Sequence, residues 1–254
     1  PDREKRGYDT TAWWASSGIL DLLKPREGLP VFPVGGVGDH ASAMALFGAI
    51  VTALYQREKT GLGDRVETSL IANGAFANGM HLQGAIAGFD LGQILDEKGY
   101  QSPFSSVYRT RDDRLMVLVS TTPLKEFPKI ARALGCEEWL LDPRFETMKG
   151  LMSARAELRD AFTEAFARRT SVELELAFEA EALSFALVER IRDVVRDAQL
   201  IENEVIVETT SEDPDFQWTV ASPFKLDSQT KRPIADPPRL GEHTVARSEE
   251  HTSE

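Results

Sequence analysis

Cysteine and histidine are both scarce in this chain. Its 254 residues include one cysteine, Cys136, and four histidines. A single cysteine excludes an internal disulfide and is typical of a protein from a reducing compartment such as the cytoplasm. Structural zinc sites use clusters of cysteine and histidine, so this composition predicts no metal site.

Positive charge is also in short supply. The chain carries 29 lysines and arginines against 41 aspartates and glutamates, which gives a formal net charge of −12. A nucleic-acid binder neutralises phosphates with clustered basic residues, so we expect no nucleic-acid partner. A local basic pocket on an acidic protein can still bind a small anion.

Long apolar runs and several functional motifs are absent. The sequence has no uninterrupted run of 18 apolar residues, and its opening PDREKRGYDT lacks the apolar segment of a signal peptide. We therefore predict a cytoplasmic protein without a membrane span. No GxGxxG, P-loop, HExxH or GxSxG pattern occurs, so dinucleotide binding, zinc proteolysis and serine hydrolysis have no support.

The first ninety residues predict three helices. Apolar periodicity indicates helices over residues 8–23, 39–59 and 70–87, with a strand over 64–70. Gly61 is the expected C-terminal cap of the second helix, and Ser69 is the expected N-terminal cap of the third. The third helix is apolar on nearly every side, which predicts a central helix or part of a subunit interface.

The remaining sequence is more charged and predicts a mixture of helices and strands. A hairpin is expected around Asp112 and Asp113, because two β-rich runs flank them. Helices are expected over 123–134, 154–169 and 172–182, and strands over 205–208 and 216–221. The change in composition places a division near residue 95.

The stretch VFPVGGVGDHASAMALFGAI raises the question of what Asp39 does. An aspartate at a helix start is usually a cap, because its carboxylate accepts hydrogen bonds from free backbone amides. The same position favours the ionised form through the helix dipole, which suits a nucleophile or a general base. The two roles compete, since a side chain engaged in capping is less free to attack.

The motifs around Asp39 resemble those of the class III CoA-transferases. GYD ends at Asp9, GD ends at Asp39, and ALYQREKTGLGDRVETSL covers residues 53–70. Asp64 stands where the family usually has glutamine. DPRFET at 142–147 and SPFKLDSQ with PPRLGEHT between 222 and 244 also resemble family signatures, so the likeness covers nearly the whole chain.

The resemblance implies an α/β fold that forms an interlocked homodimer. Residues 1–95 would be the C-terminal part of a partial Rossmann-like large domain, 96–183 a small α+β domain, and 184–246 a segment returning to the large domain. The final octamer, RSEEHTSE at 247–254, resembles translated adapter sequence, and we expect a non-native or disordered tail. Since the family begins with a Rossmann-like half, we expect the chain to be a fragment that is inactive alone.

The resemblance also implies an enzyme that moves CoA from an acyl-CoA to a small carboxylic acid. Asp39 aligns with the family's nucleophilic aspartate, which forms a covalent aspartyl intermediate, and no permanent cofactor is needed. Lys5, Arg6 and Tyr8 fall on positions that line the CoA site, although the residues alone also fit a solvated basic run and a packing tyrosine. Asp9 would orient groups beside the site or cap its own helix.

Two other functions remain open at this point. A 2-methylacyl-CoA racemase needs a second titrating group, and relatives with that activity have histidine where Tyr8 stands. Tyrosine is a poor substitute because its phenol holds its proton at neutral pH, and His40 and His81 are better interpreted as solvated or packing residues. The other alternative is a non-catalytic acyl-CoA-binding subunit that acts in dimerisation.

Overall fold

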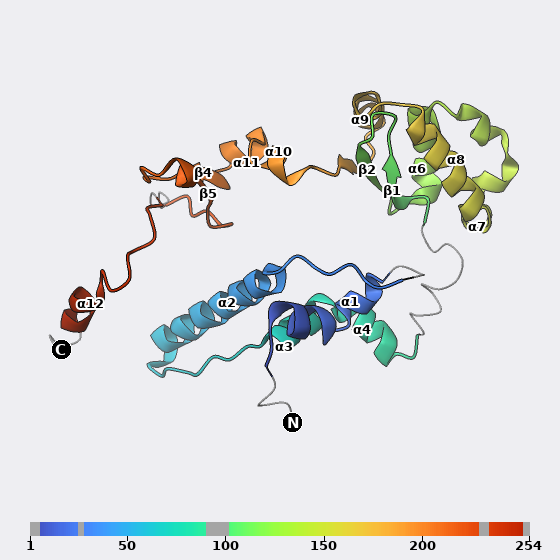
Figure 1. Cartoon of the computed structure of the whole chain (residues 1–254). Coiled ribbons are helices and arrows are strands. Elements are labelled where there is room, and N and C mark those ends of the chain that lie inside the picture. The colour runs from blue at the N-terminus through green and yellow to red at the C-terminus, as the bar shows by residue number, and fades with distance from the viewer. Residues whose placement is uncertain (1–5, 25–27, 90–101, 229–233, 251–254) are drawn as a thin grey trace. The chain divides into compact units, whose positions relative to one another are not determined.

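The computed structural model describes residues 6–24, 28–89, 102–228 and 234–250, and its chain divides into two compact units (Figure 1). Unit 1 comprises residues 1–103 and 149–160, and unit 2 comprises residues 104–148 and 161–254. The division predicted near residue 95 lies outside the described residues. The three predicted domains and their boundaries stay a prediction.

Within the described part of residues 6–89, unit 1 contains five successive helices (Figure 1). They are η1 (Asp9–Ala15), α1 (Ile19–Leu22), α2 (Val37–Thr60), α3 (Leu70–Ala77) and α4 (Gly79–Ile86). The single helix predicted over 8–23 is wrong, because η1 and α1 are separate. Gly18 has a φ of 85°, in the left-handed region that interrupts a right-handed helix, and η1 is a π-helix in which Ser16 N donates to the carbonyl oxygen of Thr11.

Helix α2 begins two residues earlier and ends one residue later than predicted. Its N-cap is Gly36, with a φ of 89°, so Asp39 is the third helical residue and not the cap. Gly61, with a φ of 73°, is the C-cap, and its N–H donates to the carbonyl oxygen of Arg57 at 2.8 Å. This left-handed glycine confirms the predicted stop.

The third predicted helix is divided at Asn78 into α3 and α4. Ser69 caps α3 as predicted, because its Oγ accepts a hydrogen bond from Ala72 N at 3.2 Å. Only one side of α3 is buried in this chain: Gly74 is buried, whereas Phe76 is 88% exposed. Burial on every side is therefore wrong for the chain by itself, and the structure assigns no strand to residues 64–70.

The buried side of α3 lies against η1. A Cβ atom added to Gly74 would lie 2.5 Å from the carbonyl oxygen of Trp13, so only glycine permits this approach. Asn78 Nδ2 donates to the carbonyl oxygen of Ser17 at 3.2 Å in the same buried contact. Helix α2 also contacts both η1 and α3, and the three elements together form the framework around Asp39.

Unit 2 contains a three-stranded antiparallel sheet with the order β1-β2-β3. The strands are β1 (Ser105–Arg109), β2 (Leu115–Val119) and β3 (Phe185–Leu187). The register pairs Ser105 with Val119 and Arg109 with Leu115. The hairpin predicted around Asp112 and Asp113 is thus confirmed, while β3 was not predicted.

The helices predicted for this part of the chain are confirmed to within a few residues. They are α6 (Pro123–Leu134), α8 (Arg155–Ala167) and α9 (Ser171–Ala180), with the shorter η2 (Glu137–Leu141), η3 (Pro143–Glu146) and α7 (Met148–Ser153) between the first two. Fully buried aromatic rings form the core of unit 2. The ring of Phe104 lies 5.7 Å from that of Phe162, and the ring of Tyr108 stacks 4.4 Å from that of Phe166.

The hairpin turn also caps α9. Asp112 Oδ1 accepts a hydrogen bond from Ser171 N at 2.8 Å, and Asp112 Oδ2 accepts one from the Ser171 hydroxyl at 2.8 Å. Thr110 donates its hydroxyl to Asp112 Oδ1 at 2.7 Å. The Thr110 and Ser171 hydroxyls hold the pKa of Asp112 well below its usual range, because they stabilise the ionised carboxylate.

The last part of unit 2 consists of short elements. They are α10 (Ile191–Val194), α11 (Ala198–Glu202), β4 (Ile206–Glu208), η4 (Pro214–Phe216), β5 (Trp218–Val220) and α12 (Thr244–Glu250). β4 pairs antiparallel with β5, which confirms the two strands predicted there. Helix α12 includes residues 247–250 of the predicted tail, and the non-native origin of that tail stays a prediction.

Helix α2 meets the length and composition test for a membrane span. An 18-residue window in its 24 residues has a mean hydropathy of 1.4, and 11% of that window is buried. The criterion of an uninterrupted apolar run does not detect this helix, because polar residues are scattered along it. Core helices pass the same test, so this single helix is weak evidence for a membrane.

Candidate active site

Asp39 lies in the first turn of α2 with its side chain exposed. Among the residues that the structure describes, no hydrogen bond or ion pair to its carboxylate is found. An N-cap or third-residue acid ordinarily accepts the free amides of the first turn. Asp39 accepts none of them, so the capping role that competes with nucleophilic attack is not the one it takes here.

Asp9 provides that cap from a different helix. It is 6% exposed, Oδ2 accepts a hydrogen bond from Gly36 N at 2.6 Å, and Oδ1 accepts one from Gly38 N at 2.9 Å. Those amides belong to the N-cap and the second residue of α2, 27 and 29 positions along the chain. The carboxylate thus satisfies two donors at the positive end of the helix dipole.

Gly38 permits this contact because it has no side chain. A Cβ atom added there would lie 2.3 Å from Asp9 Oδ1 and 2.3 Å from the Trp13 ring. Real side chains do not tolerate such distances, so the glycine before Asp39 is required by tertiary packing. Trp13 itself is 7% exposed and closes the cluster from η1.

His40 holds the same turn from its other side. Its Nδ1 lies 2.6 Å from the carbonyl oxygen of Gly36. A carbonyl oxygen can only accept, so Nδ1 carries the proton in this contact. Gly36 is therefore fixed by Asp9 through its amide and by His40 through its carbonyl.

The predicted CoA-site residues lie at the start of η1. Tyr8 is the N-cap of η1 and is 63% exposed, and Arg6 lines a hollow of about 320 Å³. Residues from η1 and from the start of α3 complete that lining, among them Thr11, Ser16 and Ser69. Lys5 lies outside the described residues. Tyr8 directly precedes Asp9 in the sequence, and Asp39 directly follows Gly38. Because Gly38 N donates a hydrogen bond to Asp9, this contact brings the two backbone segments together.

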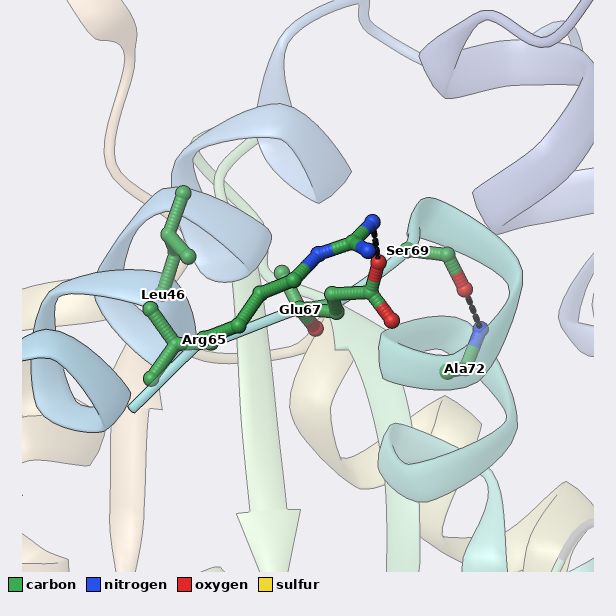
Figure 2. A pocket seen from close by; sticks show the side chains of 7 residues that line it. Leu46, Arg65, Glu67, Ser69 and Ala72 are labelled. Carbon is green, nitrogen blue, oxygen red and sulfur yellow. Dashed lines mark hydrogen bonds and ion pairs between the residues drawn. The ribbon is translucent and has the colours of Figure 1, made fainter. Parts of the chain in front are cut away.

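A second, more open groove of about 710 Å³ runs between α2 and the segment that leads into α3 (Figure 2). Leu46 lines it from α2, and Arg65 and Glu67 form an ion pair across its other side. Asp39 and Leu46 are seven positions apart, which places them on one side of the helix, about 10 Å apart along its axis. The linings of these two hollows do not include Asp39.

Sequence reasoning missed the contribution of Gly36 and Gly38. The sequence pattern contained no signal for it, because it placed the helix start at Asp39, whereas α2 has Gly36 as its N-cap. A long helix whose N-cap is glycine needs acceptors from elsewhere. That acceptor is Asp9, which the GYD motif had already associated with the site.

The CoA-transferase family III model matches residues 1–244 of this chain. The chain is 24% identical over 245 residues to the (R)-2-hydroxy-4-methylpentanoate CoA-transferase of Clostridioides difficile, covering 96% of this chain and 61% of that protein. It is 30% identical over 263 residues to an acyl-CoA transferase of Fusarium pseudograminearum, covering 98% of this chain and 55% of that protein.

The crystal structure of Rv3272 from Mycobacterium tuberculosis superposes with a TM-score of 0.81 at 23% identity, and covers 96% of this chain and 64% of that chain. At this identity the likeness shows the fold alone, a mixed α/β fold of helices with small sheets. The chain spans about three fifths of the length of the curated relatives it matches. The sequence motifs, the match to the family over residues 1–244 and the shared fold agree, and the chain belongs to CoA-transferase family III.

Proposed function

We propose that the protein transfers CoA between an acyl-CoA and a carboxylic acid through a covalent intermediate on Asp39. The observation that carries this proposal is the state of its carboxylate. It is exposed at the start of α2 and accepts none of the helix amides, because Asp9 accepts those of Gly36 and Gly38. A carboxylate oxygen that is free of backbone amides attacks without first breaking a charge-assisted hydrogen bond.

The first half of the reaction removes the acyl group from CoA. An oxygen of Asp39 attacks the thioester carbonyl, the C–S bond breaks, and an aspartyl–acyl anhydride and CoA thiolate form. The thiolate then attacks the aspartyl carbonyl of that anhydride. The donor carboxylate leaves, and Asp39 holds CoA as a thioester.

The second half repeats these steps in reverse with the acceptor. The acceptor carboxylate attacks the aspartyl thioester and releases CoA thiolate, which gives an anhydride between Asp39 and the acceptor. The thiolate attacks the acceptor acyl carbon, so the new acyl-CoA forms and the Asp39 carboxylate returns. No proton, metal or redox equivalent is consumed in this cycle.

The hollow lined by Arg6 is proposed to receive part of the CoA molecule. Arg6 lines this hollow and can pair with a phosphate, and the exposed Tyr8 lies two residues further along the chain. Lys5 is proposed for the same role. The relatives reported above are named as transferases, which favours transfer over racemisation.

The Rossmann-like half and the interlocked homodimer are part of this proposal. Large apolar side chains on α2, α3 and α4 are exposed, including Ile50, Leu54, Phe76 and Met80. Such surfaces in soluble domains are normally covered. We expect residues 1–254 alone to lack activity, and the complete gene product to sediment as a dimer.

The test is CoA exchange by variants of the complete gene product. Labelled CoA is followed from an acyl-CoA to a panel of carboxylic acids, and Asp39→Ala should reduce the rate by at least about 1,000-fold. Glu58→Gln is the control, because Glu58 is an exposed acid on the same helix. Wild-type exchange by Asp39→Ala would exclude the covalent route.

A further inference from the structure

Asp9 and Asp39 are two carboxylates that can serve the same helix start. Gly36 is the N-cap of α2, Gly38 the second residue and Asp39 the third. In a capping box a glutamate or glutamine at the third position bends back to accept the backbone amide of the N-cap residue, and Asp39 stands at this position. The amide that Asp39 would accept in this way is therefore Gly36 N.

Asp9 already occupies that amide. Its Oδ2 lies 2.6 Å from Gly36 N, the shorter of its two hydrogen bonds, and the side chain is buried. Gly36 contributes no side chain of its own to the cap. The backbone amides of Gly36 and Gly38 therefore already have a carboxylate acceptor, Asp9 of η1. Asp39 accepts neither of them.

We propose that Asp9 is a positioning residue, which keeps the Asp39 carboxylate reactive by occupying the amide that Asp39 would otherwise accept. A carboxylate bonded to a backbone amide must break a charge-assisted hydrogen bond before it can attack. Asp9 removes that requirement by satisfying the amides from another helix. This inference rests on the proposed nucleophilic role of Asp39.

The surrounding contacts keep this arrangement in place. Gly38 has no Cβ atom, so Asp9 Oδ1 can approach its amide, and the Trp13 ring packs against the same glycine. His40 Nδ1 holds the carbonyl of Gly36 at 2.6 Å, which limits rotation of that peptide. The turn before Asp39 is thus fixed by side chains on both of its polar groups.

The experiment replaces Asp9 by asparagine in the complete gene product. Asparagine has one acceptor oxygen, and its NH₂ group faces the second amide as a donor. One amide is released, and Asp39 can accept it. A competent site is one whose Asp39 hydroxylamine converts to the hydroxamate in the presence of acyl-CoA. The rate per competent site is the turnover divided by the fraction of such sites.

The expected result is a fall of about 10- to 100-fold in both kcat and kcat/KM per competent site, with KM for acyl-CoA changed less than about twofold. In the variant, Asp39 would accept a backbone amide both in the free enzyme and with acyl-CoA bound. That hydrogen bond must break before each attack, so kcat falls while KM changes little. Asp21→Asn, an exposed acid on α1, is the control and should keep the wild-type rate.

A purely structural role for Asp9 gives a different result. Asp9→Asn would then melt at a lower temperature, and its rate per competent site would equal that of wild type, which would overturn the inference. Where Asp9→Asn does not accumulate as folded protein, Asp9→Glu replaces it, because glutamate keeps both acceptors but moves them by one methylene group. Glutamate should give a smaller fall in kcat, and an unchanged rate per site would again overturn the inference.

A crystal structure of the variant provides a readout that does not depend on activity. In Asp9→Asn, an oxygen of Asp39 should lie about 2.7–3.2 Å from Gly36 N or Gly38 N. An Asp39 carboxylate that stays away from both would contradict the inference. Asp39→Asn separates the two proposals: if it exchanges CoA at the wild-type rate, the nucleophile and the positioning role both fail, whereas a normal Asp9→Asn beside an inactive Asp39→Asn removes only the positioning role.

Discussion

Asp9 Oδ1 lies 2.9 Å from the backbone nitrogen of Gly38, and this contact joins η1 to the start of α2 one residue before Asp39. Asp9 thus caps α2, and Asp39, which follows Gly38, stays exposed. In the proposed mechanism, the capping role therefore belongs to Asp9 and the nucleophilic role to Asp39. The contact is also sterically specific, because a side chain on Gly38 would occupy the space of Asp9 Oδ1.

Gly38→Ala should damage both stability and exchange activity. The added methyl group would lie 2.3 Å from both Asp9 Oδ1 and the Trp13 ring, so one of them must move. Overpacking of this kind costs about 1–3 kcal/mol, measured as the free energy of unfolding in urea. Gly35→Ala is the matched control, because nothing lies within 4 Å of the position that its methyl group would take, and it should stay within about 0.5 kcal/mol of wild type. Equal stability of the two variants would contradict the packing described here.

Gly74→Ala should destabilise the contact between α3 and η1. Its Cβ would lie 2.5 Å from the carbonyl oxygen of Trp13 and 2.8 Å from Ser17 Cβ, which predicts a loss of about 1–3 kcal/mol. Gly48→Ala is the control inside α2, where no atom lies within 4 Å. Both substitutions gain helix propensity, about 1 kcal/mol for alanine over glycine, so only the packing differs. A stabilised Gly74→Ala variant would show that the close approach does not exist.

Asp112→Asn should lower the stability of unit 2 at neutral pH by about 1 kcal/mol, because the cap of α9 loses its charge. The side chain is exposed, which keeps the effect at the low end of the range for caps. Asp113→Asn, at a position with a φ of 58° that asparagine tolerates, is the control. Equal melting temperatures for the two variants would contradict the capping role.

The same cap should give unit 2 a dependence on acid pH. The pKa of Asp112 is lower in the folded state than in the unfolded chain, where an aspartate has a pKa of about 3.9. Its contribution is therefore fully present above that value and is lost as the pH falls toward the folded-state pKa. The stability difference between wild type and Asp112→Asn, followed by urea unfolding, should shrink below about pH 4. A constant difference down to pH 2 would argue against the linkage.

Cys136 should react slowly with thiol reagents in the native protein. The side chain is 5% exposed, and burial raises the pKa of its thiol, so little thiolate is available. Labelling with a chromogenic disulfide should become fast only when urea unfolds unit 2. Rapid labelling of the native protein would indicate that the end of α6 opens locally.

Local signals in the sequence predicted much of the fold. The hairpin around Asp113, helix α6 and the left-handed cap at Gly61 follow from alternation, periodicity and a terminal glycine, which act over a few residues. The break at Gly18 and the division at Asn78 were missed because the apolar pattern continues through both positions. Gly74 packs against Trp13 and Asn78 bonds to Ser17 close to those breaks, and both are tertiary contacts that a local pattern does not contain.

The sequence identified candidate residues of the site but not the contacts among them. Asp39, Asp9, Arg6 and Tyr8 were identified through the family motifs, and the structure brings Asp9 to the helix of Asp39. The contact itself could not be predicted, because it joins residues 27 and 29 positions apart. The N-cap at Gly36, which has no capping side chain, was also not predicted, because the apolar pattern placed the helix start at Asp39.

The covalent role of Asp39 is tested most directly by trapping. The complete gene product is incubated with acyl-CoA and hydroxylamine, digested, and examined by peptide mass spectrometry. We expect a hydroxamate on Asp39, formed only when acyl-CoA is present, with Asp9 and His40 in unmodified peptides. Turnover of acyl-CoA with Asp39 unmodified at every time point, or a hydroxamate on another carboxylate, would contradict it.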